Sequence, residues 1–143
     1  MDHTAASNLI FDALAHAVAG NSEKAADALT DLGRNSDDHQ MYGVCCAIAG
    51  AGEHMLRRLY GDQAPAPGSD GMFVLGELVP GALAADPPEA FALRFLTAYA
   101  NGDTDTCMAL FNAALQSDGD QYVDSVCALL AHVAGLCRLA LKH

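Results

Sequence analysis

Apolar residues recur at helical spacing along almost the whole chain, and this periodicity limits the fold more than any other feature. The clearest breaks in it are Gly20-Asn21, residues 61–70, Asn101-Gly102 and residues 117–120. Each break combines glycine or proline with residues that end or cap helices. We therefore predict an all-α, compact bundle of six to seven helices, formed by residues 1–143 as a single domain.

Short polar residues mark the expected helix starts. Asp86-Pro87-Pro88-Glu89 is the clearest of these, because proline fits the first turn and Glu89 suits a capping box. The last helix, from Gln121 to Leu141, is apolar on nearly every side, which is typical of the centre of a bundle. Met72–Leu83 is expected to form a short, interrupted helix. The predicted N-caps are Thr4, Ser22, Asp37, Asp86 and either Asp103 or Thr104.

The chain repeats one plan in two halves, residues 4–60 and 86–142, joined by a linker over 61–85. Each half holds a medium helix, a glycine turn, a second medium helix, an acidic turn and a long helix. This order predicts two stacked three-helix units from an internal duplication, and chance similarity within an Ala-rich chain is the alternative. A superposition without gaps pairs Gly20 with Gly102, Asp38 with Asp120, Val44-Cys45 with Val126-Cys127 and Ala49 with Ala131.

The glycine turn of each half carries a short pattern of small and apolar residues. The pattern consists of Gly20, Ala25 and Leu29 in the first half and Gly102, Cys107 and Phe111 in the second. Over about ten residues, each hairpin resembles a tetratricopeptide hairpin, although the rest of that roughly 34-residue pattern is missing. The resemblance implies stacked helical hairpins and a protein-binding role.

The net charge of −11, from 18 acidic and 7 basic residues, excludes the basic surface that nucleic acids or anionic membranes require. The longest apolar run, residues 126–141, contains His132 and Arg138 and is shorter than the roughly 20 residues of a membrane span. We therefore expect a buried core helix and no membrane contact. The start, Met1-Asp2-His3-Thr4, lacks the basic region of a signal peptide, so we expect a cytoplasmic protein.

Catalytic and metal-binding motifs are missing from the sequence. The five cysteines form no Cys-x-x-Cys pair, and the adjacent Cys45 and Cys46 point to different sides of a helix. We expect reduced, buried thiols, no metal and no cofactor. Because P-loop, Gly-x-Gly-x-x-Gly and Gly-x-Ser-x-Gly patterns are also missing, we expect no enzymatic activity.

His132 is the most notable single residue, because it lies in the most apolar helix and a buried imidazole needs hydrogen-bond partners. One interpretation is a ligand contact or acid–base group in an internal pocket with Tyr99, Phe95 and Cys127. The other is a core or interface histidine whose hydrogen bonds are satisfied.

Small residues line one face of the third helix, at Gly43, Ala47, Gly50 and Ala51. Glycine inside a helix costs about 1 kcal/mol relative to alanine, so the close packing of another helix is a natural compensation. That second helix belongs either to this chain or to a second copy in a homodimer.

These features favour a non-enzymatic, acidic, helical protein-binding module, such as an adaptor, an inhibitor or an immunity-type protein. Its acidic charge favours a protein partner with a basic surface. The alternative is a small-molecule-binding helical bundle, a sensor or a sequestration protein, with its pocket near His132.

Overall fold

The computed structural model describes residues 2–64, 73 and 85–142. These residues form six α-helices and one short 3-10 helix, with no strand among them, so the prediction of an all-α compact bundle is confirmed. Apart from Phe73, the predicted helix Met72–Leu83 lies outside the described residues, as does most of the linker 61–85. The helices are α1 (His3–Val18), α2 (Ser22–Arg34), α3 (Asp38–Tyr60), η1 (Gly61–Gln63), α5 (Pro87–Ala100), α6 (Thr104–Gln116) and α7 (Gly119–Leu141).

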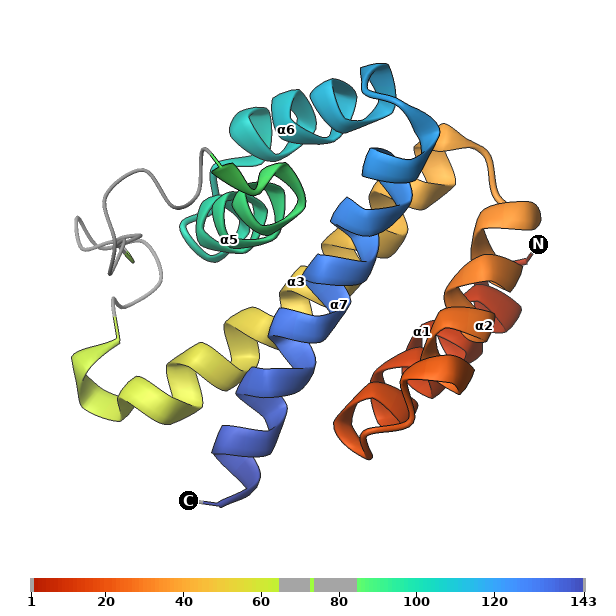
Figure 1. Ribbon diagram of the computed structural model, residues 1–143. Helices are drawn as coiled ribbons and strands as arrows, with labels where there is room; N and C mark the ends of the chain where they lie inside the picture. Colours follow the sequence, from red (N-terminus) through yellow and green to blue (C-terminus); the bar gives the residue numbers. More distant parts are fainter. Residues whose placement is uncertain (1, 65–72, 74–84, 143) are drawn as a thin grey trace.

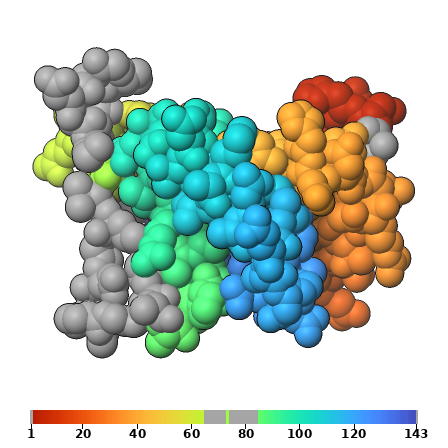
Figure 2. Space-filling view, turned by 90° about the horizontal axis from the view of Figure 1, so that it is seen from above, coloured from red at the N-terminus to blue at the C-terminus, as the bar shows by residue number. Residues whose placement is uncertain are grey.

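Two helical hairpins flank a central pair of long helices (Figure 1). The α1–α2 hairpin packs on one side of α7, and α5, with α6 against it, packs on both α3 and α7. Seen from above, Figure 2 shows the orange α2 at one end of the molecule, with the blue α7 between it and the green α5. The central position of α7 agrees with its apolar sequence.

α7 is also long and apolar enough, by length and composition alone, to cross a membrane. The core helix of a soluble protein passes the same test. In this structure α7 packs against α1, α3, α5 and α6.

Aspartate and asparagine side chains begin every α-helix. Asp37 forms a complete capping box with Gln40, whereas Asp2 and Asn21 replace the predicted caps Thr4 and Ser22. The Asp2 carboxylate accepts from the N–H of Ala5 at 2.7 Å, so the first helix begins earlier than its apolar stripe indicated. Asp86, Asp103 and Asp118 cap α5, α6 and α7.

The core lies where α3, α5 and α7 meet, and Gly52 sets how closely they approach. A Cβ atom on Gly52 would lie 2.7 Å from Leu96 Cδ1 and 2.9 Å from Val133 Cγ2. Phe95 of α5 is fully buried in this core and packs against Phe91, with ring centroids 5.3 Å apart. Close packing of other helices is therefore found within the chain at Gly52, a residue outside the predicted set of Gly43, Ala47, Gly50 and Ala51.

The two halves match closely in helix length and turn geometry. Gly20 and Gly102 occupy the same place after the first helix, with φ angles of 83° and 74°. α2 and α6 each have 13 residues, and α3 and α7 each have 23. An internal duplication accounts for this match and stays a prediction.

When the two halves are aligned by their helices, α7 is shifted by one residue relative to the superposition without gaps. Three residues (35–37) connect α2 to α3, whereas two residues (117–118) connect α6 to α7. This helix-based alignment is called the corrected register below. Ala49 thus corresponds to Leu130 rather than Ala131, and Gly50, not Ala49, corresponds to Ala131. The burial pattern follows the corrected register: Val44, Cys45, Ile48, Ala49 and Gly52 in α3 match Ser125, Val126, Leu129, Leu130 and Val133 in α7.

Candidate functional site: a groove and its filled counterpart

The four residues predicted to surround a pocket have different surroundings. Phe95 lies in the core, and the Tyr99 hydroxyl lies 3.4 Å from the Cβ position of Gly50. Cys127 lines a surface groove between α2 and α7. His132 pairs with Glu89 on α5, and of these four residues Cys127 alone lines this groove.

The imidazole of His132 is held by the first turn of α5. Its Nε2 atom lies 2.5 Å from Glu89 Oε1, and both side chains are about one-third exposed. Glu89 therefore reaches α7 instead of closing the predicted capping box with Asp86, whose carboxylate accepts the Glu89 N–H at 3.2 Å. The pair joins α5 to α7 at the edge of the core, which is a structural role for both side chains.

The small-residue face of α3 divides into two parts. Gly50 and Ala51 lie within the fold, Gly50 against Tyr99 and Ala51 against the core cluster. Gly43 and Ala47 are exposed, and among the described residues nothing lies within 4 Å of a Cβ added at Gly43.

An apolar groove runs between the α1–α2 hairpin and α7. Its volume is ≈ 670 Å³, within the usual range of ligand sites, and small aliphatic side chains dominate its walls. The end of α1 contributes Ala17 and Val18, α2 contributes Ala25, Ala26 and Leu29, and α7 contributes Cys127, Leu130, Ala131, Ala134 and Arg138.

Arg138 stands at the end of this groove. Its Nη1 donates to the carbonyl of Ala17 at 2.8 Å and to that of Val18 at 3.5 Å, the last carbonyls of α1. A cation at the C-terminus of a helix also compensates the partial negative charge there. The guanidinium is thus fixed at the groove while its side chain stays exposed.

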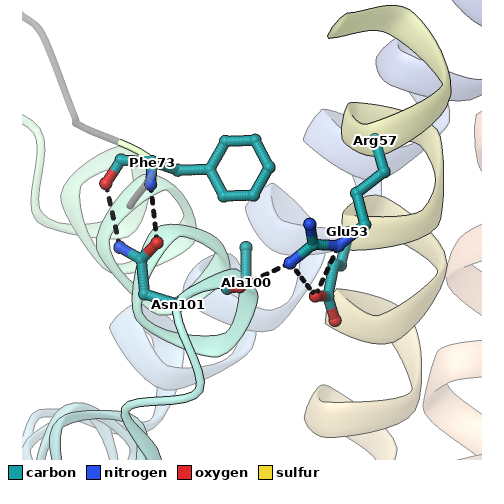
Figure 3. Close-up of polar contacts among 5 residues, drawn as sticks. All are labelled: Glu53, Arg57, Phe73, Ala100 and Asn101. Carbon is teal, nitrogen blue, oxygen red and sulfur yellow. Dashed lines mark hydrogen bonds and ion pairs between the residues drawn. The ribbon is translucent and has the colours of Figure 1, made fainter. Parts of the chain in front are cut away.

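Arg57 makes the corresponding contact in the other half, as Figure 3 shows. Its Nη2 donates to the carbonyl of Ala100 at 3.4 Å, at the end of α5, and it forms an ion pair with Glu53 at 3.0 Å. Arg57 thus contacts the C-terminus of α5. In the corrected register, Arg57 corresponds to Arg138, and Ala100 corresponds to Val18.

The chain itself covers Arg57. The guanidinium lies 5.3 Å from the centre of the Phe73 ring, and Asn101 holds the Phe73 backbone with two hydrogen bonds (Figure 3). The Phe73 N–H donates to Asn101 Oδ1 at 2.6 Å, and Asn101 Nδ2 donates to the Phe73 carbonyl at 2.9 Å. This arrangement provides a cation–π contact and fixes the chain beside it.

One residue difference explains why a groove is open between α1 and α7 while the corresponding space between α5 and α3 is filled. Tyr99 at the end of α5 corresponds to Ala17 at the end of α1, and each faces the long helix of the other half. The Tyr99 ring lies against Gly50, whereas Ala17 and Ala131, the counterpart of Gly50, both line the groove. The phenol ring of Tyr99 thus fills, between α5 and α3, the space that stays open beside Ala17, between α1 and α7.

The polar groups of the groove do not form a catalytic pair. Burial, with a smaller contribution from Asp124, raises the pKa of the Cys127 thiol, so the thiol is protonated and weakly nucleophilic at neutral pH. The other polar side chains in the lining are Ser22 and Arg138. Among the described residues, no three His, Cys, Asp or Glu side chains come together to hold a metal ion.

Neither this groove nor the role of Arg138 in it was predicted from the sequence. One sequence feature could have indicated the groove. The superposition without gaps pairs Ala17 with Tyr99, a small residue with a large one, at the end of the first helix of each half. Comparison with protein families, curated protein sequences and solved structures finds no match for this chain.

Proposed function

We propose that the protein binds an apolar small molecule, as a sensor or a sequestration protein, in the groove between α1–α2 and α7. The observation that carries this proposal is the open space of ≈ 670 Å³ beside Ala17, at the place where Tyr99 packs in the other half. The groove replaces the pocket near His132 as the proposed site, because His132 is not part of its lining.

The chemistry of the lining supports reversible binding without catalysis. Alanine, valine and leucine side chains offer an apolar surface, and displacing water from such a surface favours association. The protonated thiol of Cys127 and the fixed guanidinium of Arg138 supply polar contacts without an acid–base pair.

A neutral fluorescent probe tests the proposal. We expect N-phenyl-1-naphthylamine to bind the full-length protein saturably, with one site and enhanced fluorescence. Ala17→Tyr, which copies Tyr99, and Ala131→Leu, on the opposite wall, should each weaken binding at least tenfold. Ala15→Tyr is the matched control, because Ala15 is exposed on α1 and lies outside the lining. Equal binding by all four proteins would place the probe elsewhere and overturn the assignment.

A protein-binding role, as an adaptor, an inhibitor or an immunity-type module, is the second candidate. It is supported by the net charge of −11 and by two large apolar side chains, Phe11 and Leu141, that are each 72% exposed. The acidic surface favours a basic partner and accelerates encounter with it. An association rate that falls steeply with salt, and falls again in Phe11→Asp, supports this role, whereas a salt-insensitive complex counts against it.

Self-association is tested separately, because exposed Gly43 and Ala47 leave one face of α3 accessible. Light scattering after size-exclusion chromatography distinguishes a monomer of 14.9 kDa from a dimer. If a dimer forms through this face, Ala47→Glu should dissociate it while leaving the helical content unchanged.

A further inference from the structure

The environment of Arg57 indicates what Arg138 lacks. Arg57 has a carboxylate partner, Glu53, and an aromatic cover, Phe73. In the corrected register, the counterpart of Glu53 is Ala134, which lines the groove. Among the described residues, no carboxylate forms an ion pair with Arg138 and no aromatic ring lies over it.

Two groups that the other half possesses, the ring of Tyr99 and the carboxylate of Glu53, have small groove residues as their counterparts. Ala17 replaces the ring of Tyr99, Ala134 replaces the carboxylate of Glu53, and both alanines are groove residues. The groove thus lacks an apolar ring and an anionic group, next to a guanidinium whose position is already fixed by two carbonyls.

We propose that the groove is a site for an organic carboxylate with an aromatic body, whose ring lies between α1–α2 and α7 and whose carboxylate pairs with Arg138. This inference rests on the proposed function and adds the chemical class of the ligand. The guanidinium is suited to this role because it stays charged at any physiological pH and has five N–H donors. Since only Nη1 donates to α1, the remaining N–H groups can form a two-bond contact with a carboxylate.

The ligand supplies the ring and the carboxylate that Tyr99 and Glu53 supply in the other half. The small side chains at Ala17, Ala25 and Ala131 leave space for a flat ring. The groove volume of ≈ 670 Å³ lies within the usual range of small-molecule sites, so it accommodates one or two rings and a short acidic side chain. The overall charge of −11 opposes anion binding at long range, so recognition depends on the local contact with Arg138.

Two probes that differ only in charge test this inference. 1-Naphthylacetate and its neutral amide, 1-naphthylacetamide, are titrated into the full-length protein by isothermal calorimetry. We expect the acid to bind at least tenfold more tightly than the amide. Arg138→Gln should abolish this preference, and Arg138→Lys should retain part of it because the charge remains while the planar fork is lost. Arg94→Gln, on α5 outside the groove, is the control variant.

The outcomes separate this inference from the proposed function. If acid and amide bind equally, and Arg138→Gln changes neither, the groove binds apolar molecules without recognising a carboxylate and the inference is wrong. If Ala17→Tyr leaves the binding of N-phenyl-1-naphthylamine unchanged, the groove is not the site and the proposed function fails first. Unchanged melting of Arg138→Gln shows that its loss of binding does not come from unfolding.

Discussion

Replacing Gly52 by alanine tests whether the close approach of α3, α5 and α7 holds the core together. The added methyl group would lie 2.7 Å from Leu96 Cδ1 and 2.9 Å from Val133 Cγ2, closer than carbon atoms pack. Val133 is fully buried and β-branched, so it has little freedom to rotate away. One of the helices must therefore shift, or Leu96 must change its rotamer.

Two opposing contributions set the size of the effect. Alanine is a better helix former than glycine by about 1 kcal/mol inside a helix, which stabilises the variant. Adding a methyl group to a packed core costs about 1–3 kcal/mol. Gly43→Ala is the matched control, because it lies in the same helix and nothing among the described residues is within 4 Å of its new methyl group.

Urea unfolding followed by circular dichroism measures both variants against the parent protein. Gly43→Ala should gain about 1 kcal/mol from helix propensity alone. Gly52→Ala should be less stable than Gly43→Ala by about 2 kcal/mol, the cost of overpacking, because the propensity gain is common to both. With an m value of about 2 kcal/mol per molar urea, their midpoints differ by about 1 M. Equal stabilisation of the two variants would refute the packing argument.

Four further predictions follow from individual contacts. Asn101→Ala removes both hydrogen bonds to Phe73 and should lower the free energy of unfolding in urea by about 1–2 kcal/mol; an unchanged midpoint would contradict this. His132→Leu should leave the affinity for N-phenyl-1-naphthylamine unchanged in fluorescence titration, because His132 does not line the groove. Burial, and then the nearby Cys46 and Asp103, raises the pKa of Cys107 from 9.0 to about 11. The unfolded thiol ionises first, so this contribution to stability is complete below pH 9 and is lost as the pH rises to 11, which thermal melts across that range detect. Occupation of the groove by the probe should slow alkylation of Cys127, as read by mass spectrometry of its peptide, and equal rates would place the probe elsewhere.

Local chemistry explains the parts of the fold that were predicted from sequence. Asp37, Asp86 and Asp103 were predicted as caps and act as caps, because a short carboxylate reaches a backbone N–H three residues ahead in any helix. The first two caps were misplaced by one or two residues, at Thr4 and Ser22, because several polar residues compete at each start.

The candidate site was much less accessible to prediction. His132 stood out because it lies in an apolar helix, but its contact is with Glu89, which lies 43 positions away in the sequence. The sequence had instead predicted that Glu89 would complete a capping box at the start of its own helix. Helical periodicity indicates which side of α7 is apolar, and it does not indicate which helix covers that side.

The amino-acid sequence alone was enough to predict the helices, the caps Asp37, Asp86 and Asp103 and the repeated plan of the two halves, because periodicity and capping act within a few residues. The tertiary structure alone shows that Arg57 and Arg138 each reach the end of the first helix of the other half. It also decided that the space filled by Tyr99 on one side is open beside Ala17 on the other. These features arise from packing between distant segments, where a shift of one residue at residues 117–118 changes which side chains meet.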